Sequence, residues 1–274
     1  MTGATTQVSI VIATRNCASS LQRCIESIAT QEGVRCETIV IDGASADGTP
    51  RLLAENKARG AIADYVSEPD DGVYSAFNKG VRRARGEWIT FLGCDDVFHD
   101  RFVLRDLLAA ASGRVVYGKV NLVSASGEIV GTVGGPWSRE AFLEGASLPH
   151  PGCLHHRSLF EARGFFDESY RIAGDYELLL RELLHTEPRF VDRVLVDMRL
   201  GGLSRDPKTV PVVLREVIRA RGAHGLGKPT ARLSRALLLS RTAAAVDALV
   251  GRRAFGVLAD AGRALRGKPR VWTR

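Results

Sequence analysis

Two adjacent carboxylates, Asp95 and Asp96, follow a short apolar run at 88–92 that is rich in aromatic and β-branched side chains. Such a run, bounded by glycines, favours a buried strand. Neighbouring carboxylates at a strand end repel each other, and a bound divalent cation relieves that repulsion. A helix cap needs only one carboxylate, and Asp100 is better placed for it. The pair therefore predicts a metal site, with a solvated turn as the alternative.

Three further polar residues follow predicted strands. Asp42 closes the second apolar run, and Thr14 and Asn16 follow the first. The carboxyl ends of parallel strands meet at one edge of a sheet, so we expect these side chains to be neighbours. A carboxylate there can accept an N–H from uracil, thymine or guanine. The alternative is a plain βα loop over 42–49.

Strand-like and helix-like segments alternate before residue 205, which predicts an α/β fold with a mostly parallel, Rossmann-like sheet flanked by helices. Ligands bind such sheets beyond the carboxyl ends of the strands. The predicted strands are 8–13, 37–42, 63–68 and 87–92, and the predicted helices are 19–30, 49–59 and 73–85.

The net charge of +7 is unevenly distributed. Residues 1–204 carry 22 Lys+Arg against 27 Asp+Glu, a balance of −5, and residues 205–274 carry 16 against 4, a balance of +12. This division predicts a catalytic body at 1–204 and a basic, mainly helical C-terminal extension at 205–274. The extension could lie on an anionic membrane surface or pack on the body. It has few aromatic residues to stack on bases, which argues against nucleic acid.

No apolar stretch is long enough to span a membrane, and no basic region precedes the first apolar run, so the sequence predicts a cytoplasmic protein. The cysteines are odd in number and form no CxxC pair, which favours reduced thiols. They are Cys17, Cys24, Cys36, Cys94 and Cys153.

A Pro-Asp-Asp-Gly turn at 69–72 precedes the predicted helix at 73–85. Asp70, Asp71 and Asn78 could help to hold a nucleotide near the start of that helix, while the basic residues at 79–83 face its phosphates. The alternative for all of them is a solvated helix face.

Five blocks of the sequence resemble, in order and spacing, those of the family 2 glycosyltransferases with the GT-A fold. The resemblance covers residues 8 to 204. The blocks are "VSIVIATRN", "IVIDGASADGT", "SEPDDGVYSAFNKG", "GEWITFLGCDD" and "GFFDESYRIAGDYELLLR".

The resemblance implies an inverting enzyme that transfers a sugar from a nucleoside-diphosphate donor. It implies that Asp42 contacts the base, that Asp96 coordinates Mn²⁺ or Mg²⁺, and that Asp95 lies near the ribose and the metal. Cys94 departs from the family pattern, where an acidic or polar residue is common. A hard cation on the diphosphate stabilises the charge of the leaving group, so the enzyme needs one further carboxylate as a base.

Asp175 is the candidate base. It opens a predicted helix, where the alternative role is an N-cap. The resemblance implies that this Asp removes the proton of the acceptor hydroxyl, with Glu177 as the second choice. Gly174 stands where many members of the family have Glu.

His150 lies between Pro149 and Pro151, which restrict it to an extended backbone and favour a contact with metal, phosphate or acceptor. His155 and His156 would point to opposite faces and cannot share one metal. The loop at 201–206 could fold over the donor and bring Ser204 or Arg205 to the diphosphate.

The predicted partners are thus a UDP, dTDP or GDP sugar and a saccharide or lipid-linked acceptor. Two alternatives remain. One is a non-catalytic nucleotide-sugar-binding or scaffold protein, and the other is a nucleotide-sugar pyrophosphorylase, although its glycine-rich phosphate loop is absent from "ATRNCASS".

Overall fold

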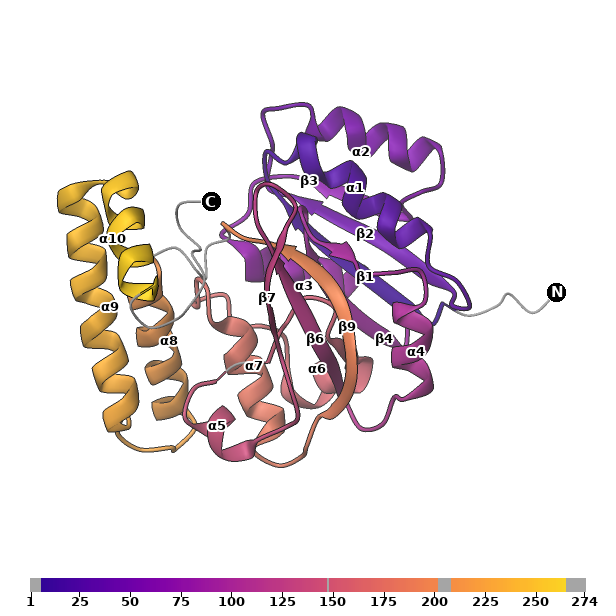
Figure 1. Cartoon of the computed structure of the whole chain (residues 1–274). Helices are drawn as coiled ribbons and strands as arrows, with labels where there is room; N and C mark the ends of the chain where they lie inside the picture. Colours follow the sequence, from indigo (N-terminus) through magenta and orange to yellow (C-terminus); the bar gives the residue numbers. More distant parts are fainter. Residues whose placement is uncertain (1–5, 147, 202–207, 265–274) are drawn as a thin grey trace.

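A computed structural model describes residues 6–146, 148–201 and 208–264 of the chain. One nine-stranded sheet runs through the body in the order β3-β2-β1-β4-β8-β6-β9-β5, and β7 pairs with β6 at its side (Figure 1). The strands are β1 (Val8–Thr14), β2 (Cys36–Asp42), β3 (Asp64–Ser67), β4 (Trp88–Gly93), β5 (Val97–Phe98), β6 (Val115–Val123), β7 (Ile129–Val133), β8 (Leu154–His156) and β9 (Arg189–Arg199).

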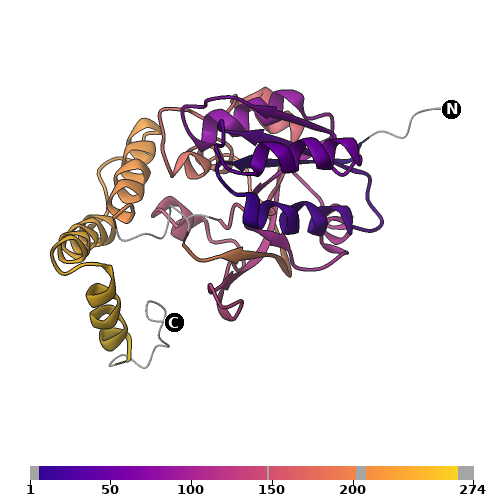
Figure 2. The same cartoon turned by 90° about the horizontal axis from the view of Figure 1, so that it is seen from above.

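Helices cover both faces of this sheet, and three more form the C-terminal part of the described chain (Figures 1 and 2). They are α1 (Ala18–Ala29), α2 (Thr49–Ala58), α3 (Val73–Arg83), α4 (Val103–Ala109), α5 (Arg139–Leu143), α6 (Arg157–Arg163), α7 (Gly174–Leu183), α8 (Val210–Ala223), α9 (Ala231–Val250) and α10 (Arg252–Ala264).

The first four strands of the sheet order, β3-β2-β1-β4, are all parallel. β6 also runs parallel to β9, and the remaining pairs are antiparallel. The predicted α/β fold with a mostly parallel, helix-flanked sheet is confirmed. The observed ends of the strands and helices predicted above lie within two residues of the predicted ends. β1 and its neighbours are apolar on both faces because each face is covered by helices.

Two apolar cores lie on opposite faces of the sheet. One packs α1, α2 and α4 on one face, through side chains such as Leu21, Leu53 and Leu104. The other packs α3, α6 and α7 on the opposite face, through side chains such as Phe77, Phe160 and Leu179. The second core continues into the C-terminal helices, because it also contains residues of α8 and α9.

The C-terminal helices pack in series: α8 on α7, α9 on α8, and α10 on α9 (Figure 1). The predicted domain boundary at 204 and 205, together with Ser204 and Arg205, lies outside the described residues. Among the described helices, none is both long enough and apolar enough to cross a membrane.

The cysteines differ from the sequence prediction. Cys17 and Cys94 form a disulfide, whereas Cys24, Cys36 and Cys153 are free. The prediction of five reduced thiols is therefore wrong for one pair. Cys17 follows β1 and Cys94 follows β4, and these strands are neighbours in the sheet although 77 residues separate the two cysteines.

Candidate active site

The acidic pair lies just beyond the end of β4. Asp96 is 4% exposed, whereas Asp95 is exposed. The Gly93 N–H donates to Asp96 Oδ2 at 3.0 Å, and the backbone of Arg199, at the end of β9, also favours the charged form of Asp96 and so opposes the rise in its pKa. A Cβ at Gly93 would lie 2.9 Å from Asp96 Oδ2 and 3.2 Å from Asp95 Oδ1, so both carboxylates lie over this glycine.

The electrostatics of the pair fit a divalent cation. Burial, followed by the charge of Asp95, raises the pKa of Asp96 to about 7. A cation would remove this cost, since two hard carboxylate oxygens suit Mg²⁺ or Mn²⁺. In the part of the chain that the structure describes, no group of three or more His, Cys, Asp or Glu side chains could hold a metal. Metal coordination by Asp96 therefore stays a prediction, and substrate phosphate and water would have to complete the coordination shell.

Asp42 lies at the end of β2, opposite Thr14 in the register of β1 and β2, as the sequence predicted. Its carboxylate is fully buried. Ser45 donates to it through its backbone N–H at 3.1 Å and through its hydroxyl, and the Ser67 hydroxyl donates to Oδ2 at 2.6 Å. A ligand that reaches Asp42 must therefore displace Ser45 or use a remaining lone pair. The base contact of Asp42 stays a prediction.

The other residues predicted to contact the nucleotide differ in burial and in hydrogen bonding. The Thr14 hydroxyl is buried without a partner among the described residues. Asn16 Oδ1 accepts a hydrogen bond from the Ala46 N–H at 2.9 Å, which fixes the Asn16 side chain to the loop after β2. Asp70 Oδ2 lies 2.8 Å from where a Cβ on Gly43 would stand, so it approaches the Asp42 loop, whereas Asp71 is exposed.

Two helical residues have other roles than the predicted donor contact. Asn78 is 1% exposed and hydrogen-bonds both the N–H and the carbonyl of Phe166, at 3.0 and 2.9 Å. Lys79 forms an ion pair with Glu68 at 2.8 Å. The suggestion that Asn78 faces the donor is thus wrong, because its amide is used to hold the loop before α7.

Asp175 lies in the first turn of α7. The Tyr74 hydroxyl lies 3.3 Å from Asp175 Oδ1 and 2.5 Å from the carbonyl oxygen of Ile172. Burial raises the pKa of Asp175 to about 6, which suits a general base that works near neutral pH. A Cβ at Gly174 would lie 2.8 Å from the Tyr74 ring. Glycine at position 174, where the resemblance leads one to expect Glu, therefore leaves room for Tyr74, which contacts Asp175.

Glu177, the second choice for a base, is already paired. Its Oε1 lies 2.9 Å from His224 Nε2, and its Oε2 accepts from Arg181 at 2.8 Å. Oε1 thus joins α7 to the end of α8, and Oε2 is held within α7 by Arg181.

The sequence analysis missed Glu216 on α8. Its carboxylate is 9% exposed and accepts backbone N–H groups of Arg171, Ile172 and Ala173 at 2.7, 2.9 and 2.8 Å. These residues directly precede α7, so Glu216 holds the segment that positions Asp175. The available signal was that Glu216 is the sole acidic residue of an otherwise basic helix.

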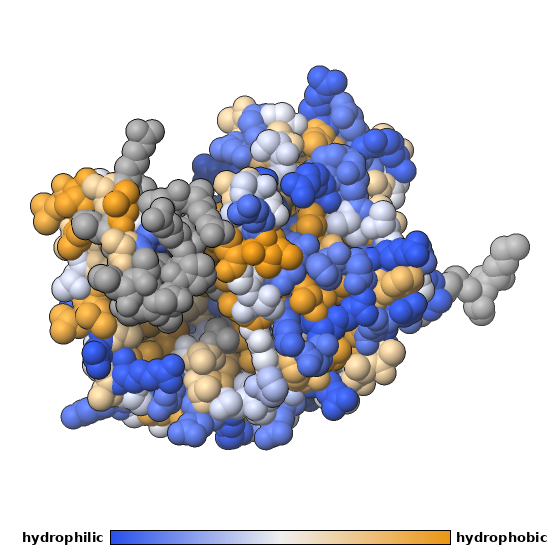
Figure 3. Space-filling model, viewed as in Figure 1, coloured by the Kyte–Doolittle hydropathy of each residue, from blue (hydrophilic) through white to orange (hydrophobic). Residues whose placement is uncertain are grey.

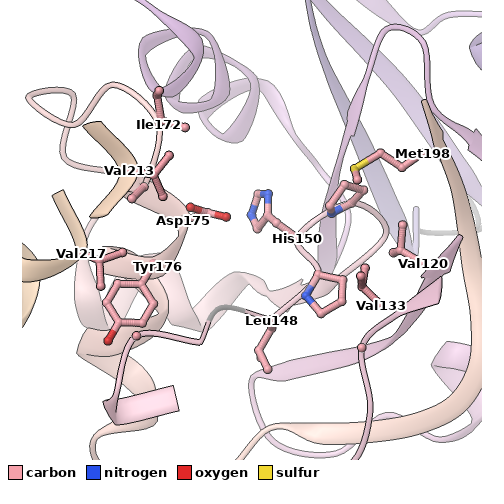
Figure 4. Close-up of a pocket in the computed structure, with 15 residues that line it drawn as sticks. Val120, Val133, Leu148, His150, Ile172, Asp175, Tyr176, Met198, Val213 and Val217 are labelled. Atoms are coloured by element: carbon pink, nitrogen blue, oxygen red, sulfur yellow. The ribbon is translucent and has the colours of Figure 1, made fainter. Parts of the chain in front are cut away.

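A cavity of about 410 Å³ lies beside Asp175, between α7, α8 and the ends of β6, β7 and β9 (Figure 4). The Asp175 carboxylate and the His150 ring point toward one another in it, and Met198 lies on the far side of His150 (Figure 4). Met198 precedes Arg199, whose backbone contacts Asp96. The cavity therefore extends from the candidate base toward the acidic pair. Its labelled lining residues are Val120, Val133, Leu148, His150, Ile172, Asp175, Tyr176, Met198, Val213 and Val217.

His150 is an aromatic neighbour in this cavity. Its ring stacks on Phe91 at 5.2 Å between centroids, and burial lowers its pKa to about 4, so it is neutral. Its Nε2 is buried with no partner in the described chain. His155 is buried and His156 is partly exposed, as predicted for adjacent residues of an extended segment. Metal coordination by His150 stays a prediction.

Comparisons with known proteins bear on the family to which the chain belongs. The family model of glycosyl transferase family 2 matches residues 9–137. An uncharacterized glycosyltransferase of Mycobacterium tuberculosis is 33% identical over 220 residues, which are 77% of this chain and 82% of that protein. A PGL/p-HBAD biosynthesis glycosyltransferase of Mycobacterium bovis is 30% identical over 194 residues, covering 68% of this chain and 73% of that protein.

Solved structures share the fold at low sequence identity. The mannosyltransferase PcManGT from Pyrobaculum calidifontis, in complex with GDP-Man and Mn²⁺, has a TM-score of 0.61 and 19% identity over 99% of this chain and 84% of its own. S. aureus TarS 1-349 in complex with UDP-GlcNAc has a TM-score of 0.61 and 17% identity, covering 78% of this chain and 66% of its own. The fold is that of the GT-A glycosyltransferases, and the chain belongs to glycosyl transferase family 2.

Proposed function

We propose that this glycosyltransferase moves a sugar, with inversion, from a UDP, dTDP or GDP sugar to a hydroxyl of a saccharide or lipid-linked acceptor. One observation carries the proposal. Asp175, whose pKa is raised to about 6, lines a cavity. The far wall of this cavity contains Met198, and the backbone of the next residue, Arg199, lies close to Asp96. The cavity thus leads from the proposed base toward β5 and the end of β9, beside which the acidic pair lies.

The residues of this chain divide the work. Asp175 accepts the proton of the acceptor hydroxyl as that oxygen attacks the anomeric carbon, while the bond from this carbon to the diphosphate breaks on the opposite face. Tyr74 and Glu216 keep Asp175 in place. Asp96 and Asp95 would hold Mn²⁺ or Mg²⁺. When bound, the cation stabilises the negative charge of the departing diphosphate.

The donor end of the proposal is supported by the neighbours of the fold. One is solved with GDP-Man and Mn²⁺ and another with UDP-GlcNAc. Asp42 would accept the N–H of the base, with Thr14 and Asn16 beside it, and Asp70, Asp71 and Asp95 closer to the ribose and phosphates. The M. bovis relative is named for PGL/p-HBAD biosynthesis, which supports an acceptor of that kind. Succinoglycan biosynthesis protein ExoO of Rhizobium meliloti is 32% identical over 200 residues, which cover 64% of this chain and 55% of that protein, and its name supports an acceptor from polysaccharide biosynthesis.

The exposed apolar side chains and the positive charge of the C-terminal segment support the proposal that it contacts an anionic membrane. Five exposed apolar side chains of α9 fall within an arc of about 120° at the rotation of an α-helix, and the tail carries a balance of +12. Figure 3 shows apolar surface over these helices. Sedimentation with phosphatidylglycerol vesicles, but not with phosphatidylcholine vesicles, would support this location. The exposed large apolar residues described in α9 and α10 are Leu238, Leu239, Val246, Leu249, Val250 and Val257.

The test begins with a thermal-shift screen of nucleoside diphosphates and their sugars, with and without Mn²⁺. Release of nucleoside diphosphate is then measured for the parent and for Asp96→Asn and Asp175→Asn. Glu161→Gln is the control, since this residue is exposed on α6. We expect both aspartate variants to lose turnover, and Asp175→Asn to keep donor binding. Stabilisation by a donor without turnover under any acceptor condition would instead indicate a non-catalytic binding protein.

A further inference from the structure

The cavity beside Asp175 is unusually apolar for a place where a sugar would bind. Side chains from several elements supply its walls, with Val213 and Val217 coming from the C-terminal extension. Figure 4 shows Leu148 and Val133 on one side and Ile172 and Val213 on the other, around the space that Asp175 enters. Most of the lining is hydrocarbon, so little of it can hydrogen-bond a ligand.

Few polar atoms face this space. The Tyr176 hydroxyl donates to the carbonyl of Phe142 at 3.0 Å and is therefore already used. Asp175 and His150 remain, and they point toward one another across the space (Figure 4). The two polar residues together are enough to hold one hydroxyl.

A whole sugar ring fits this lining poorly, because each hydroxyl taken from water without a new hydrogen bond opposes binding. An apolar group is favoured instead, since it removes hydrocarbon surface from water. The volume of about 410 Å³ is also informative. A cavity of roughly 150 Å³ holds benzene, so this one has room for an aromatic ring with an alkyl chain of several carbons.

We propose that the acceptor is amphiphilic: its reacting hydroxyl lies between Asp175 and His150, and an apolar aglycone joined close to that hydroxyl fills the cavity between α8 and the β6–β7 hairpin. This inference rests on the proposed function for the identity of the reaction, and it adds the chemical class of the acceptor. The residues that select the aglycone are Met198, Val213 and Val217, together with Val120, Val133 and Leu148.

The experiment compares methyl, hexyl and phenyl glycosides of the same sugars as ligands and as acceptors. Binding is measured by calorimetry in the presence of the donor's nucleoside diphosphate, and turnover by release of that diphosphate. We expect hexyl and phenyl glycosides to bind at least about tenfold more tightly than methyl glycosides, because several carbons leave water. Equal binding, within about twofold, would overturn the proposal.

Two variants locate the effect. Met198→Gln and Val213→Thr place polar atoms in the wall at nearly constant volume, and the double variant should reduce the hexyl and phenyl preference to less than about threefold. Val212→Thr is the matched control, because Val212 is a half-buried neighbour on α8 that does not line the cavity. The thermal midpoint of each variant confirms folding. A preference that the double variant leaves intact places the aglycone elsewhere and refutes the site.

The two readouts separate this inference from the proposed function. A protein that hydrolyses or transfers from a donor but prefers no aglycone retains the proposed function and loses the inference. A protein that binds hexyl glycosides through Met198 and Val213 without any turnover retains the apolar site and loses the proposed reaction.

Discussion

Glu216→Gln is the most informative single change, because one carboxylate both holds the segment before α7 and acts on the charge of Asp175. Glu216 Oε2 accepts the N–H groups of Ile172 and Ala173, and Oε1 accepts that of Arg171. In glutamine one of these oxygens becomes an NH₂ group, which cannot accept from a facing N–H. At least one buried N–H therefore loses its partner, and the others lose a charged acceptor.

The cost follows from these contacts. A hydrogen bond to a charged group contributes ~1.5–3 kcal/mol, and an unsatisfied buried donor costs ~1–3 kcal/mol, so we expect a loss of ~2–4 kcal/mol in the free energy of unfolding. At ~2–4 °C per kcal/mol, the thermal midpoint should fall by roughly 4–16 °C. Urea denaturation measures the free energy directly.

Glu216→Gln should also shift the pH dependence of kcat/KM, in a direction that a loss of stability alone would not produce. The charge of Glu216 is one of the causes that raise the pKa of Asp175, after burial. Removing this charge lowers the pKa of Asp175, so the deprotonated base persists to lower pH. The acidic limb of kcat/KM should therefore shift to lower pH, even though the variant is less stable.

Glu216→Asp serves as the conservative comparison, since it keeps the charge and shortens the side chain. It should lose stability and leave the acidic limb close to that of the parent. Our reasoning is refuted if Glu216→Gln has the stability of the parent, or if its acidic limb moves to higher pH.

Four other outcomes are expected. Asp175→Asn should lower kcat/KM by ~10²–10⁴-fold in the release assay. It should not lower the urea midpoint near neutral pH, because a folded-state pKa of about 6 means that the ionised carboxylate destabilises the fold above that pH. In the parent, kcat/KM should rise with pH up to about 6 and then level off, as the pH profile measures, because Asp175 must lose its proton to act as a base. Glu182→Ala should cost ~2–4 kcal/mol in urea, since the fully buried carboxylate pairs with Arg114 and Arg163. Chelation with EDTA should weaken nucleoside-diphosphate binding in calorimetry by at least about tenfold, and Mn²⁺ should restore it, because Asp96 and Asp95 otherwise repel the diphosphate.

The strand ends were predictable because local signals agree there. The run at 88–92 has the composition of a buried strand, and in the structure Asp96 follows it at the end of β4. Thr14 and Asp42 follow two such runs, and parallel pairing puts them opposite each other. Periodicity and turn residues thus located the edge of the sheet at which ligands of this fold bind.

Contacts between distant segments were not predictable in the same way. Asn78 has the spacing of a solvated or ligand-facing residue, but its amide hydrogen-bonds Phe166, 88 residues later. The disulfide of Cys17 and Cys94 depends on the order of β1 and β4 in the sheet, which no cysteine spacing records. The lone acid of the basic helix α8 was a visible signal, but its partners, which lie 43 to 45 residues earlier in the chain, were not.

The division of the chain by charge also differs from its division by packing. The basic segment begins near residue 205, yet α8 supplies Glu216 to the Asp175 segment and Val213 and Val217 to the cavity wall. Among their described side chains, α9 and α10 expose six large apolar ones. On the proposed function, the boundary therefore lies after α8, because α8 would complete the site for the acceptor hydroxyl and the two helices beyond it present apolar surface. An amphiphilic acceptor held at a membrane would find both parts of its binding site in this one segment.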